Sequence, residues 1–359
     1  MIDRLISADS HVVPLPSFWR EYLPAQLRDR APRIESTDEG DFSVFEGRRA
    51  PVMAINSIAG KSRDGQGFSY RRFTEQLAGG HDPAARIADQ ERDGIAAEVL
   101  YGGGPLVTED RELFLASHLA YNHWLADYCA HAPDRLLGVA YIPFESAAGA
   151  AAEIRRSRRS GLRGALLPAA PPFGHWWDEA WSPVWEALVE TGTPAGLHVG
   201  FGFARRHRFA DGPAFLTDVV MTKLEMAAPL ADLIFGGVLA RHPELRVISV
   251  EAYIGWLPFV AEYVDHAYRV HRYWNDVGLA EAPSFYLRRQ VYATFIEDPV
   301  GLRERHAFGV DNIMWSSDYP HGESTFPDSR GFVERAFAGV PPEETRKIVY
   351  ENARRLYHL

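Results

Sequence analysis

Eight short apolar segments constrain the fold of this 359-residue chain more than any other feature. Each segment is rich in Val, Ile, Leu or Ala, and stretches with helical spacing separate most of them. They occupy residues 5–9, 96–101, 136–143, 164–168, 194–200, 246–251, 290–295 and 312–317. Such segments are typical of strands that are buried on both faces, and their alternation with helices predicts a parallel sheet.

Helical patterns fill most of the intervals between these segments. They cover residues 110–132, 147–160, 178–191, 213–241, 255–274 and 341–356. Eight strands favour a closed (β/α)8 TIM barrel over an open doubly wound sheet, and no Gly-x-Gly-x-x-Gly motif follows the first strand to indicate a dinucleotide site. One long insertion, residues 23–85, interrupts the pattern and contains a predicted hairpin near residues 42–53. We expect a single domain, residues 1–359, with the insertion serving as a lid or a dimer contact.

The bulk composition excludes several classes of protein. Hydrophobic residues make up 46% of the chain and charged residues 24%, which is typical of a soluble globular protein. The formal net charge of −10, without a basic stripe, argues against a nucleic-acid partner. No signal peptide or membrane-spanning segment is visible, and the single Cys129 cannot form an internal disulfide. We expect a cytoplasmic protein that binds a small-molecule substrate and no membrane, and the aromatic residues of 255–274 are compatible with a homodimer.

Polar side chains follow the predicted strands at the points where the strands end. In chain order they are Asp9, His11, His198, Glu251, Asp318 and His321. The i, i+2 spacing of Asp9 and His11 puts both side chains on the same side of an extended segment. Because the carboxyl ends of barrel strands share one face of the barrel, we expect all six side chains to converge there.

This group of side chains has the composition of a metal site. Imidazole and carboxylate together suit a divalent ion such as zinc, manganese or iron, and three or four protein ligands leave room for water or substrate. Each residue alone has an ordinary structural explanation, such as a turn cap or a buried histidine. Their joint occurrence at the ends of strands one, five and eight favours a metal centre formed by Asp9, His11, His198 and Asp318.

Five motifs relate the chain to a known family. They are Ala-Asp-Ser-His-Val-Val, Asp-Pro-Ala-Ala-Arg-Ile-Ala-Asp-Gln-Glu-Arg-Asp-Gly-Ile, Gly-Leu-His-Val-Gly, Ile-Gly-Trp-Leu-Pro and Trp-Ser-Ser-Asp-Tyr-Pro-His. With these motifs the chain resembles the amidohydrolase-related family, and within it the branch of aminocarboxymuconate-semialdehyde decarboxylase, related aromatic-acid decarboxylases and many hydrolases. The resemblance implies a (β/α)8 barrel with one divalent ion, held at places that correspond to Asp9, His11, His198 and Asp318.

The chain departs from this resemblance at two strand ends. Many relatives carry His-x-His or Glu-x-His on strand one, whereas Asp9 and His11 here add negative charge and favour a harder ion such as manganese. Decarboxylase relatives carry a catalytic histidine at the end of strand six, where the best match is Glu251. Glu251 could be a further ligand, a general base or a partner that orients a ligand, or it could form a buried salt bridge to an arginine.

Three functions are compatible with these residues. The main expectation is hydrolysis of an amide, ester, lactone or thioester by a metal-activated water, with Asp318 accepting the water proton and Glu251 or His321 assisting. The alternative is non-oxidative decarboxylation of an aromatic or enoic acid, against which the missing strand-six histidine counts. A third interpretation is an inactive barrel that acts as a binding protein. Candidate groups for substrate or carboxylate recognition are Arg48, Arg49, Arg205, Arg206, His207, Tyr253 and Tyr319.

Overall fold

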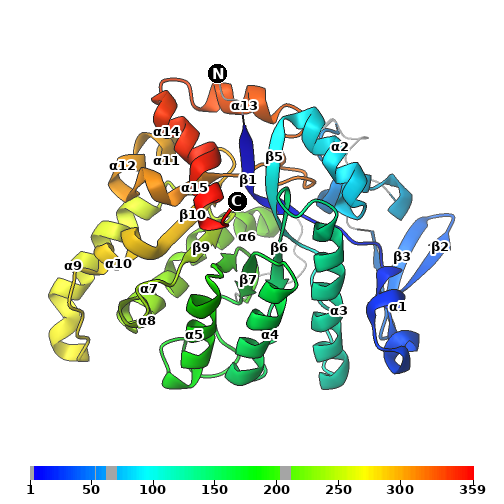
Figure 1. Ribbon diagram of the computed structural model, residues 1–359, viewed down its shortest axis with the longest axis horizontal. Helices are drawn as coiled ribbons and strands as arrows, with labels where there is room; N and C mark the ends of the chain where they lie inside the picture. Colours follow the sequence, from blue (N-terminus) through cyan, green and yellow to red (C-terminus); the bar gives the residue numbers. More distant parts are fainter. Residues whose placement is uncertain (1–3, 53, 62–70, 203–211) are drawn as a thin grey trace. The chain divides into compact units, whose positions relative to one another are not determined.

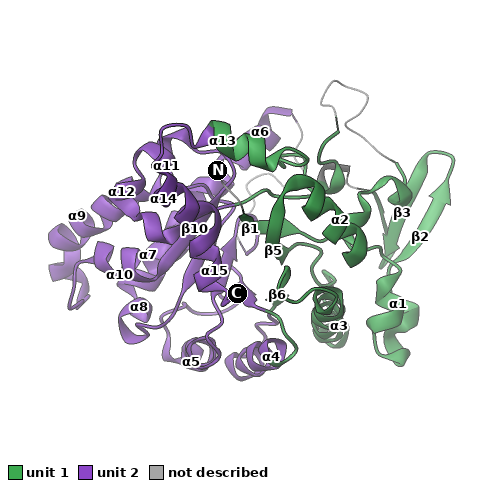
Figure 2. Cartoon of the chain, turned by 45° about the horizontal axis from the view of Figure 1, so that its top comes forward, with its two compact units in different colours: residues 1–141, 159–162, 316–335 green, residues 142–158, 163–315, 336–359 purple. Residues whose placement is uncertain are grey.

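The structure is a computed structural model that describes residues 4–52, 54–61, 71–202 and 212–359. Two compact units make up the chain, coloured separately in Figure 2. Unit 1 contains Met1–Tyr141, Arg159–Leu162 and Ser316–Arg335, and unit 2 contains Ile142–Arg158, Arg163–Trp315 and Ala336–Leu359. The candidate recognition residues Arg205, Arg206 and His207 lie outside the described residues.

Unit 1 contains three parallel strands of the barrel. They are β1 (Leu5–His11), β5 (Ile95–Tyr101) and β6 (Leu136–Tyr141), with β5 in the middle. Helix α2 (Pro83–Asp93) precedes β5 and packs against it, and α3 (Arg111–Ala130) connects β5 to β6 (Figure 1). Every residue of β1 is buried, as the apolar start of this segment predicts.

Capping residues explain where the two helices of unit 1 begin and end. The Asp82 carboxylate accepts hydrogen bonds from the amides of Ala84 and Ala85 at the start of α2. Gly94 ends this helix in the left-handed conformation, with φ of 77°, which glycine adopts without a Cβ clash. Asp110 caps α3 by accepting from the amide of Leu113.

The insertion after β1 forms its own small antiparallel sheet. It begins with α1 (Phe18–Tyr22) and continues through β2 (Arg33–Thr37), β3 (Gly40–Phe45) and β4 (Arg48–Pro51). The turn between β3 and β4 has positive φ at Glu46 and Gly47, as a tight two-residue hairpin requires. The predicted hairpin is thus confirmed and has one additional strand, β2. One 3-10 turn, Ala25–Arg30, lies between α1 and β2, and three more follow β4 at Ala54–Ser57, Phe73–Glu75 and Ala78–Gly80.

Unit 2 contains five parallel strands that neighbour one another in chain order. They are β7 (Gly164–Leu167), β8 (Ala195–His198), β9 (Val247–Val250), β10 (Val291–Phe295) and β11 (Ile313–Trp315). With the strands of unit 1 they give the eight parallel strands of an α/β barrel fold, with the antiparallel insertion after β1. Each strand begins within one residue of its predicted start.

The helices of unit 2 include those predicted for residues 147–160, 178–191, 255–274 and 341–356, together with short helices that were not predicted. The long helix predicted for residues 213–241 is wrong, because the chain forms α6 (Gly212–Glu225), α7 (Ala227–Phe235) and α8 (Val238–Arg241) instead. Gly237, with φ of 73°, separates the last two. The other helices are α4 (Ala147–Arg159), α5 (Ser182–Thr191), α9 (Leu257–Asn275), α10 (Pro283–Gln290), α11 (Pro299–Arg303), α12 (Arg305–Phe308), α13 (Ser329–Ala336, which begins in unit 1), α14 (Pro342–Arg346), a π-helix (Lys347–Glu351) and α15 (Asn352–Leu356). Among the helices of the described ranges, none combines the length and the hydropathy needed to cross a membrane.

Candidate metal centre

The segment that follows β11 runs beside the end of β1 within unit 1. The amide of Asp318 donates a hydrogen bond to the carbonyl of Asp9 at 3.0 Å, and the amide of His11 donates to the carbonyl of Tyr319 at 2.6 Å. These backbone contacts hold the predicted strand-one and strand-eight site residues next to one another. Their side chains can therefore act as one group.

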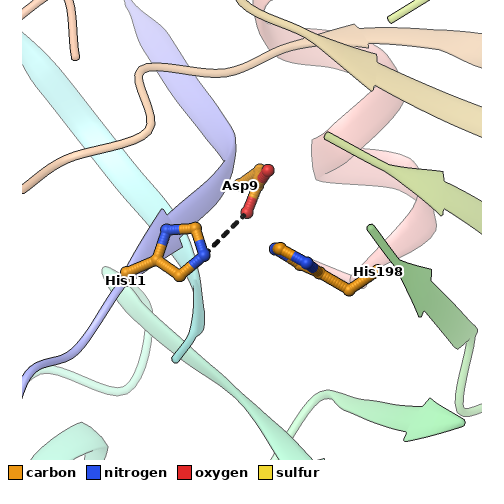
Figure 3. Close-up of side chains that lie close together, drawn as sticks. All are labelled: Asp9, His11 and His198. Carbon is orange, nitrogen blue, oxygen red and sulfur yellow. Dashed lines mark ion pairs between the residues drawn. The ribbon is translucent and has the colours of Figure 1, made fainter. Parts of the chain in front are cut away.

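Two histidines contact the same carboxylate oxygen in this group. Nδ1 of His11 and Nδ1 of His321 each lie 3.0 Å from Oδ1 of Asp318, and the two imidazole rings stack with centroids 3.8 Å apart. Nε2 of His11 lies 4.0 Å from Oδ1 of Asp9, the contact dashed in Figure 3. Asp9, His11 and Asp318 are buried, whereas a quarter of the His321 side chain is exposed. The structure thus brings together four of the six predicted strand-end residues in unit 1.

The donor set fits a divalent metal ion. His11, Asp318 and His321 each offer a ligand atom, and these atoms all lie within 4.8 Å of one another. Oδ1 of Asp318 is buried and accepts no hydrogen bond from any described residue, because the nearby imidazole nitrogens do not have hydrogen-bond geometry. A buried carboxylate is unfavourable unless it is paired or coordinates a cation. Mixed nitrogen and oxygen donors around a shared carboxylate suit zinc, manganese or iron(II).

The other two strand-end residues meet in unit 2. His198, the last residue of β8, has Nε2 3.2 Å from Oε2 of Glu251, and its Nδ1 lies 2.9 Å from the carbonyl of Val199. The ammonium group of Lys223, on α6, lies 2.8 Å from Oε1 of Glu251. Glu251 therefore contacts an imidazole on one side and a cation on the other. His198 is the third side chain drawn in Figure 3, and it belongs to unit 2, whereas Asp9 and His11 belong to unit 1.

Lys223 is the site residue that the sequence analysis missed. The sequence suggested that Glu251 could form a buried salt bridge to an arginine. Among the described residues, its salt bridge is to Lys223 instead. A signal was present, because the chain has only three lysines, Lys61, Lys223 and Lys347, among 38 basic residues. Most basic residues of this chain are arginines, so a single lysine in the largely apolar segment 213–241 is unusual.

The backbone is strained at three of the predicted site residues. Asp318, Glu251 and Tyr253 have φ values of 56°, 60° and 65°, in the left-handed region. They are three of the six non-glycine residues with positive φ that the described ranges contain. Such conformations cost about 1–3 kcal/mol each and persist where the surroundings enforce them, as they often do at functional sites. This strain supports a functional interpretation of the three positions.

Tyr319 has contacts with the protein interior. Only 2% of its surface is exposed, its hydroxyl donates a hydrogen bond to Asp89, and the guanidinium of Arg86 lies 4.4 Å from its ring centroid. Burial raises the pKa of the Tyr319 hydroxyl well above its ordinary value, so this group stays protonated. The other candidate tyrosine, Tyr253, lies with its ring 5.5 Å from the Lys223 ammonium. Substrate contact by either tyrosine remains a prediction.

The barrel fold and the buried imidazole and carboxylate cluster define a class of metal-dependent α/β-barrel enzymes. The model of the amidohydrolase family matches residues 68–359, and the chain belongs to this family. It is an enzyme of the amidohydrolase superfamily, so the interpretation as an inactive binding protein is not supported.

Similar proteins of known activity are decarboxylases. The γ-resorcylate decarboxylase of Polaromonas sp. is 24% identical over 300 residues, which cover 77% of this chain and 87% of that protein. An amidohydrolase structure from Mycobacterium avium subsp. paratuberculosis aligns with a TM-score of 0.78 and 24% identity, over 99% of this chain and 100% of the other. The 5-carboxyvanillate decarboxylase of Novosphingobium aromaticivorans, solved with manganese and 3-methoxy-4-hydroxy-5-nitrobenzoic acid, aligns with a TM-score of 0.69 and 20% identity, over 99% and 97%.

These comparisons correct the main functional expectation. Hydrolysis of an amide, ester, lactone or thioester is contradicted, because the similar proteins whose reaction is known are aromatic-acid decarboxylases. The error has a physical cause: a metal held by strands one, five and eight can assist either reaction, so the ligand pattern does not separate them. The absence of a histidine at the end of strand six therefore does not argue against decarboxylation.

Proposed function

We propose that the protein is a divalent-metal-dependent, non-oxidative decarboxylase of an aromatic carboxylic acid. The observation that carries the proposal is the buried cluster of His11, Asp318 and His321 beside Asp9, in a chain whose relatives decarboxylate such acids. In the reaction the bond between the ring carbon and the carboxylate breaks and carbon dioxide leaves. The electron pair stays on the ring carbon and takes up one proton, so no oxidant or reductant is needed.

Asp9, His11, His198 and Asp318 are proposed to hold the metal ion. Two carboxylates favour a hard ion, and a neighbouring structure contains manganese, so manganese is the first candidate. When bound, the ion supplies positive charge that binds and orients the substrate's carboxylate and an adjacent oxygen. The Nδ1 contact of His198 with the Val199 carbonyl supports its role, because histidine ligands commonly donate the second ring N–H to such an oxygen and keep Nε2 as the ligand atom.

Asp318 and His321 are proposed to deliver the proton to the ring carbon. The Asp318 carboxyl is buried, and the partly exposed His321 contacts the same oxygen at 3.0 Å. His321 can therefore connect Asp318 with solvent and replace the proton after each turnover. Glu251, whose Oε2 lies 3.2 Å from the same Nε2 of His198 and whose Oε1 contacts Lys223, is proposed as a further carboxylate ligand of the ion.

Decarboxylation in deuterated water tests this proposal. The purified protein, loaded with manganese, is incubated with 2,6-dihydroxybenzoate, 5-carboxyvanillate and related aromatic acids, and the products are followed by NMR and carbon dioxide release. We expect at least one acid to lose its carboxylate and gain a single deuterium at the same carbon. Chelator-treated protein serves as the control. Turnover of esters or lactones, with no carbon dioxide from any acid of the panel, would contradict the proposal.

A further inference from the structure

Lys223 is a partly buried cation beside the proposed metal ligands of unit 2. It lies in the last turn of α6, where the helix C-terminus favours positive charge, and 17% of its side chain is exposed. Its ammonium group lies 2.8 Å from Oε1 of Glu251 and 5.5 Å from the ring centroid of Tyr253. Burial of an ammonium group is unfavourable unless the charge is paired, so the contact with Glu251 compensates the burial of Lys223.

The backbone and the side chain of Glu251 are held by different groups. The amide of Glu251 donates a hydrogen bond to Oγ1 of Thr294 on β10 at 2.8 Å, and its φ of 60° keeps the residue in the left-handed region. The side chain is 15% exposed, with Oε1 beside Lys223 and Oε2 3.2 Å from Nε2 of His198. The two carboxylate oxygens of Glu251 therefore have different neighbours, and Oε2 is the one beside the proposed ligand nitrogen.

The contact with Lys223 determines how Glu251 can bind the ion. A carboxylate binds a divalent ion through one oxygen or through both. Lys223 donates a hydrogen bond to Oε1, so Glu251 offers Oε2 as a single ligand atom next to Nε2 of His198. A second oxygen would take a coordination position that the substrate needs, because a catalytic metal site keeps a position open.

Lys223 also changes the charge of the site. The proposed ligands Asp9, Asp318 and Glu251 carry three negative charges, whereas manganese carries two positive charges. The one remaining negative charge would repel the carboxylate of an aromatic acid. The ammonium group of Lys223 balances this charge, and because its contact with Glu251 is largely shielded from solvent, salt screens it weakly.

We propose that Lys223 is a positioning residue that adapts the metal centre to an anionic substrate. It holds Glu251 to one ligand oxygen and balances the remaining negative charge of the proposed ligands, so that a carboxylate can approach. Given the proposed decarboxylase function, on which this inference rests, the enzyme should bind an aromatic acid in preference to its uncharged product, the same ring after loss of carbon dioxide.

Manganese affinity tests the role of Lys223 without any substrate. Metal-free, full-length protein is titrated with manganese, and the free ion is followed by electron paramagnetic resonance. We expect Lys223→Met to lower the manganese dissociation constant roughly tenfold, because Glu251 then has both oxygens available and lacks the neighbouring positive charge. Lys223→Arg, which keeps the charge, should stay near the wild-type value. Replacing a lysine that only supports the fold would give the opposite result, weaker metal binding.

Two further variants separate charge from packing. Adding Glu251→Gln to Lys223→Met should reverse the gain in affinity, since the additional negative charge is then removed. The matched control is Lys347→Met, at a lysine whose side chain is 39% exposed and whose ammonium group lies 2.7 Å from Asp311, and it should bind manganese as the wild type does. Circular dichroism melting checks that each variant is folded, and Lys223→Gln repeats the measurement in case Lys223→Met is unfolded.

Substrate selection provides the second measurement. For an acid that the protein decarboxylates, Lys223→Met should raise KM about tenfold with a smaller change in kcat, whereas inhibition by the uncharged product should stay near its wild-type strength. If no acid is decarboxylated, the proposed function fails, and the manganese titration still decides the role of Lys223. An unchanged or higher manganese dissociation constant in folded Lys223→Met, or an equal loss of affinity for the acid and its uncharged product, would overturn the proposal.

Discussion

Asp318 contacts two histidines through one buried oxygen, and this shared contact distinguishes it from a carboxylate in a simple ion pair. Both Nδ1 atoms lie 3.0 Å from Oδ1, and neither forms a hydrogen bond with it. A metal ion held by this oxygen and by His11 would compensate the charge of the buried carboxylate. Asp318 is therefore the residue whose charge matters most to the site.

Replacing Asp318 by asparagine tests this role while side-chain size is preserved. We expect Asp318→Asn to lower kcat for decarboxylation by about 10²–10⁴-fold, with a much smaller change in KM, because the variant lacks the group that transfers the proton. Steady-state kinetics at saturating manganese measure both constants. Asp328→Asn, at an exposed aspartate paired with Arg335, is the matched control and should keep normal kinetics. Near-normal turnover by Asp318→Asn would remove Asp318 from the mechanism.

The sequence predicted part of this residue group for a clear physical reason. The i, i+2 pair on β1 and the polar residues after β11 could be placed because strand ends on one face of a parallel sheet come together. The contact between Lys223 and Glu251 could not be derived, because the two residues are 28 positions apart and their contact depends on how α6 packs within unit 2. The roles of Arg205 and Arg206 remain predictions.

Among the elements, helix α2 connects the parts of unit 1 that contain the candidate metal centre. Its Arg86 is fully buried and donates two hydrogen bonds to Glu98 of β5, at 2.6 and 3.0 Å. The same guanidinium donates to the carbonyl of His11 at 2.8 Å and lies over the ring of Tyr319, the residue that follows Asp318. One helical side chain thus supports the backbone beside two proposed metal ligands.

Arg86→Met should strongly destabilise the protein. We expect a loss of about 3–5 kcal/mol in the free energy of unfolding, because Glu98 would keep its buried charge without the cation. Combining it with Glu98→Gln should recover part of the loss, since the unpaired charge is then removed. Chemical denaturation measures both variants, and Arg335→Met, at an exposed arginine, is the control with little expected change. A small effect of Arg86→Met would show that this buried pair contributes little to stability.

Element types were easier to predict than the places where helices break. All eight barrel strands were found, because apolar runs of Val, Ile and Leu between helical stretches are a strong signal. The interval 213–241 was read as one helix because its apolar spacing continues through Gly236 and Gly237, where the chain in fact turns. Helices α10, α11 and α12 were missed because they are only eight, five and four residues long, and short helices carry little periodicity.

For the whole molecule, the fold alone did not decide the reaction. The same barrel and metal ligands are compatible with hydrolysis and decarboxylation, and comparison with decarboxylases of aromatic acids was needed to separate them. The formal net charge of −10 disfavours approach of an anionic substrate, so local positive charge must compensate. We expect a bound divalent ion to be the main source of this positive charge, so the proposed activity depends on the metal.

Metal content tests that claim most directly. Elemental mass spectrometry is applied to full-length protein, as purified and after reconstitution with manganese and removal of excess ion, beside His11→Ala and the control His306→Ala, whose histidine side chain is 62% exposed. We expect about one divalent ion per chain in the wild type and the control, and a large loss in His11→Ala. No stoichiometric metal after reconstitution, or an unchanged metal content in His11→Ala, would contradict it.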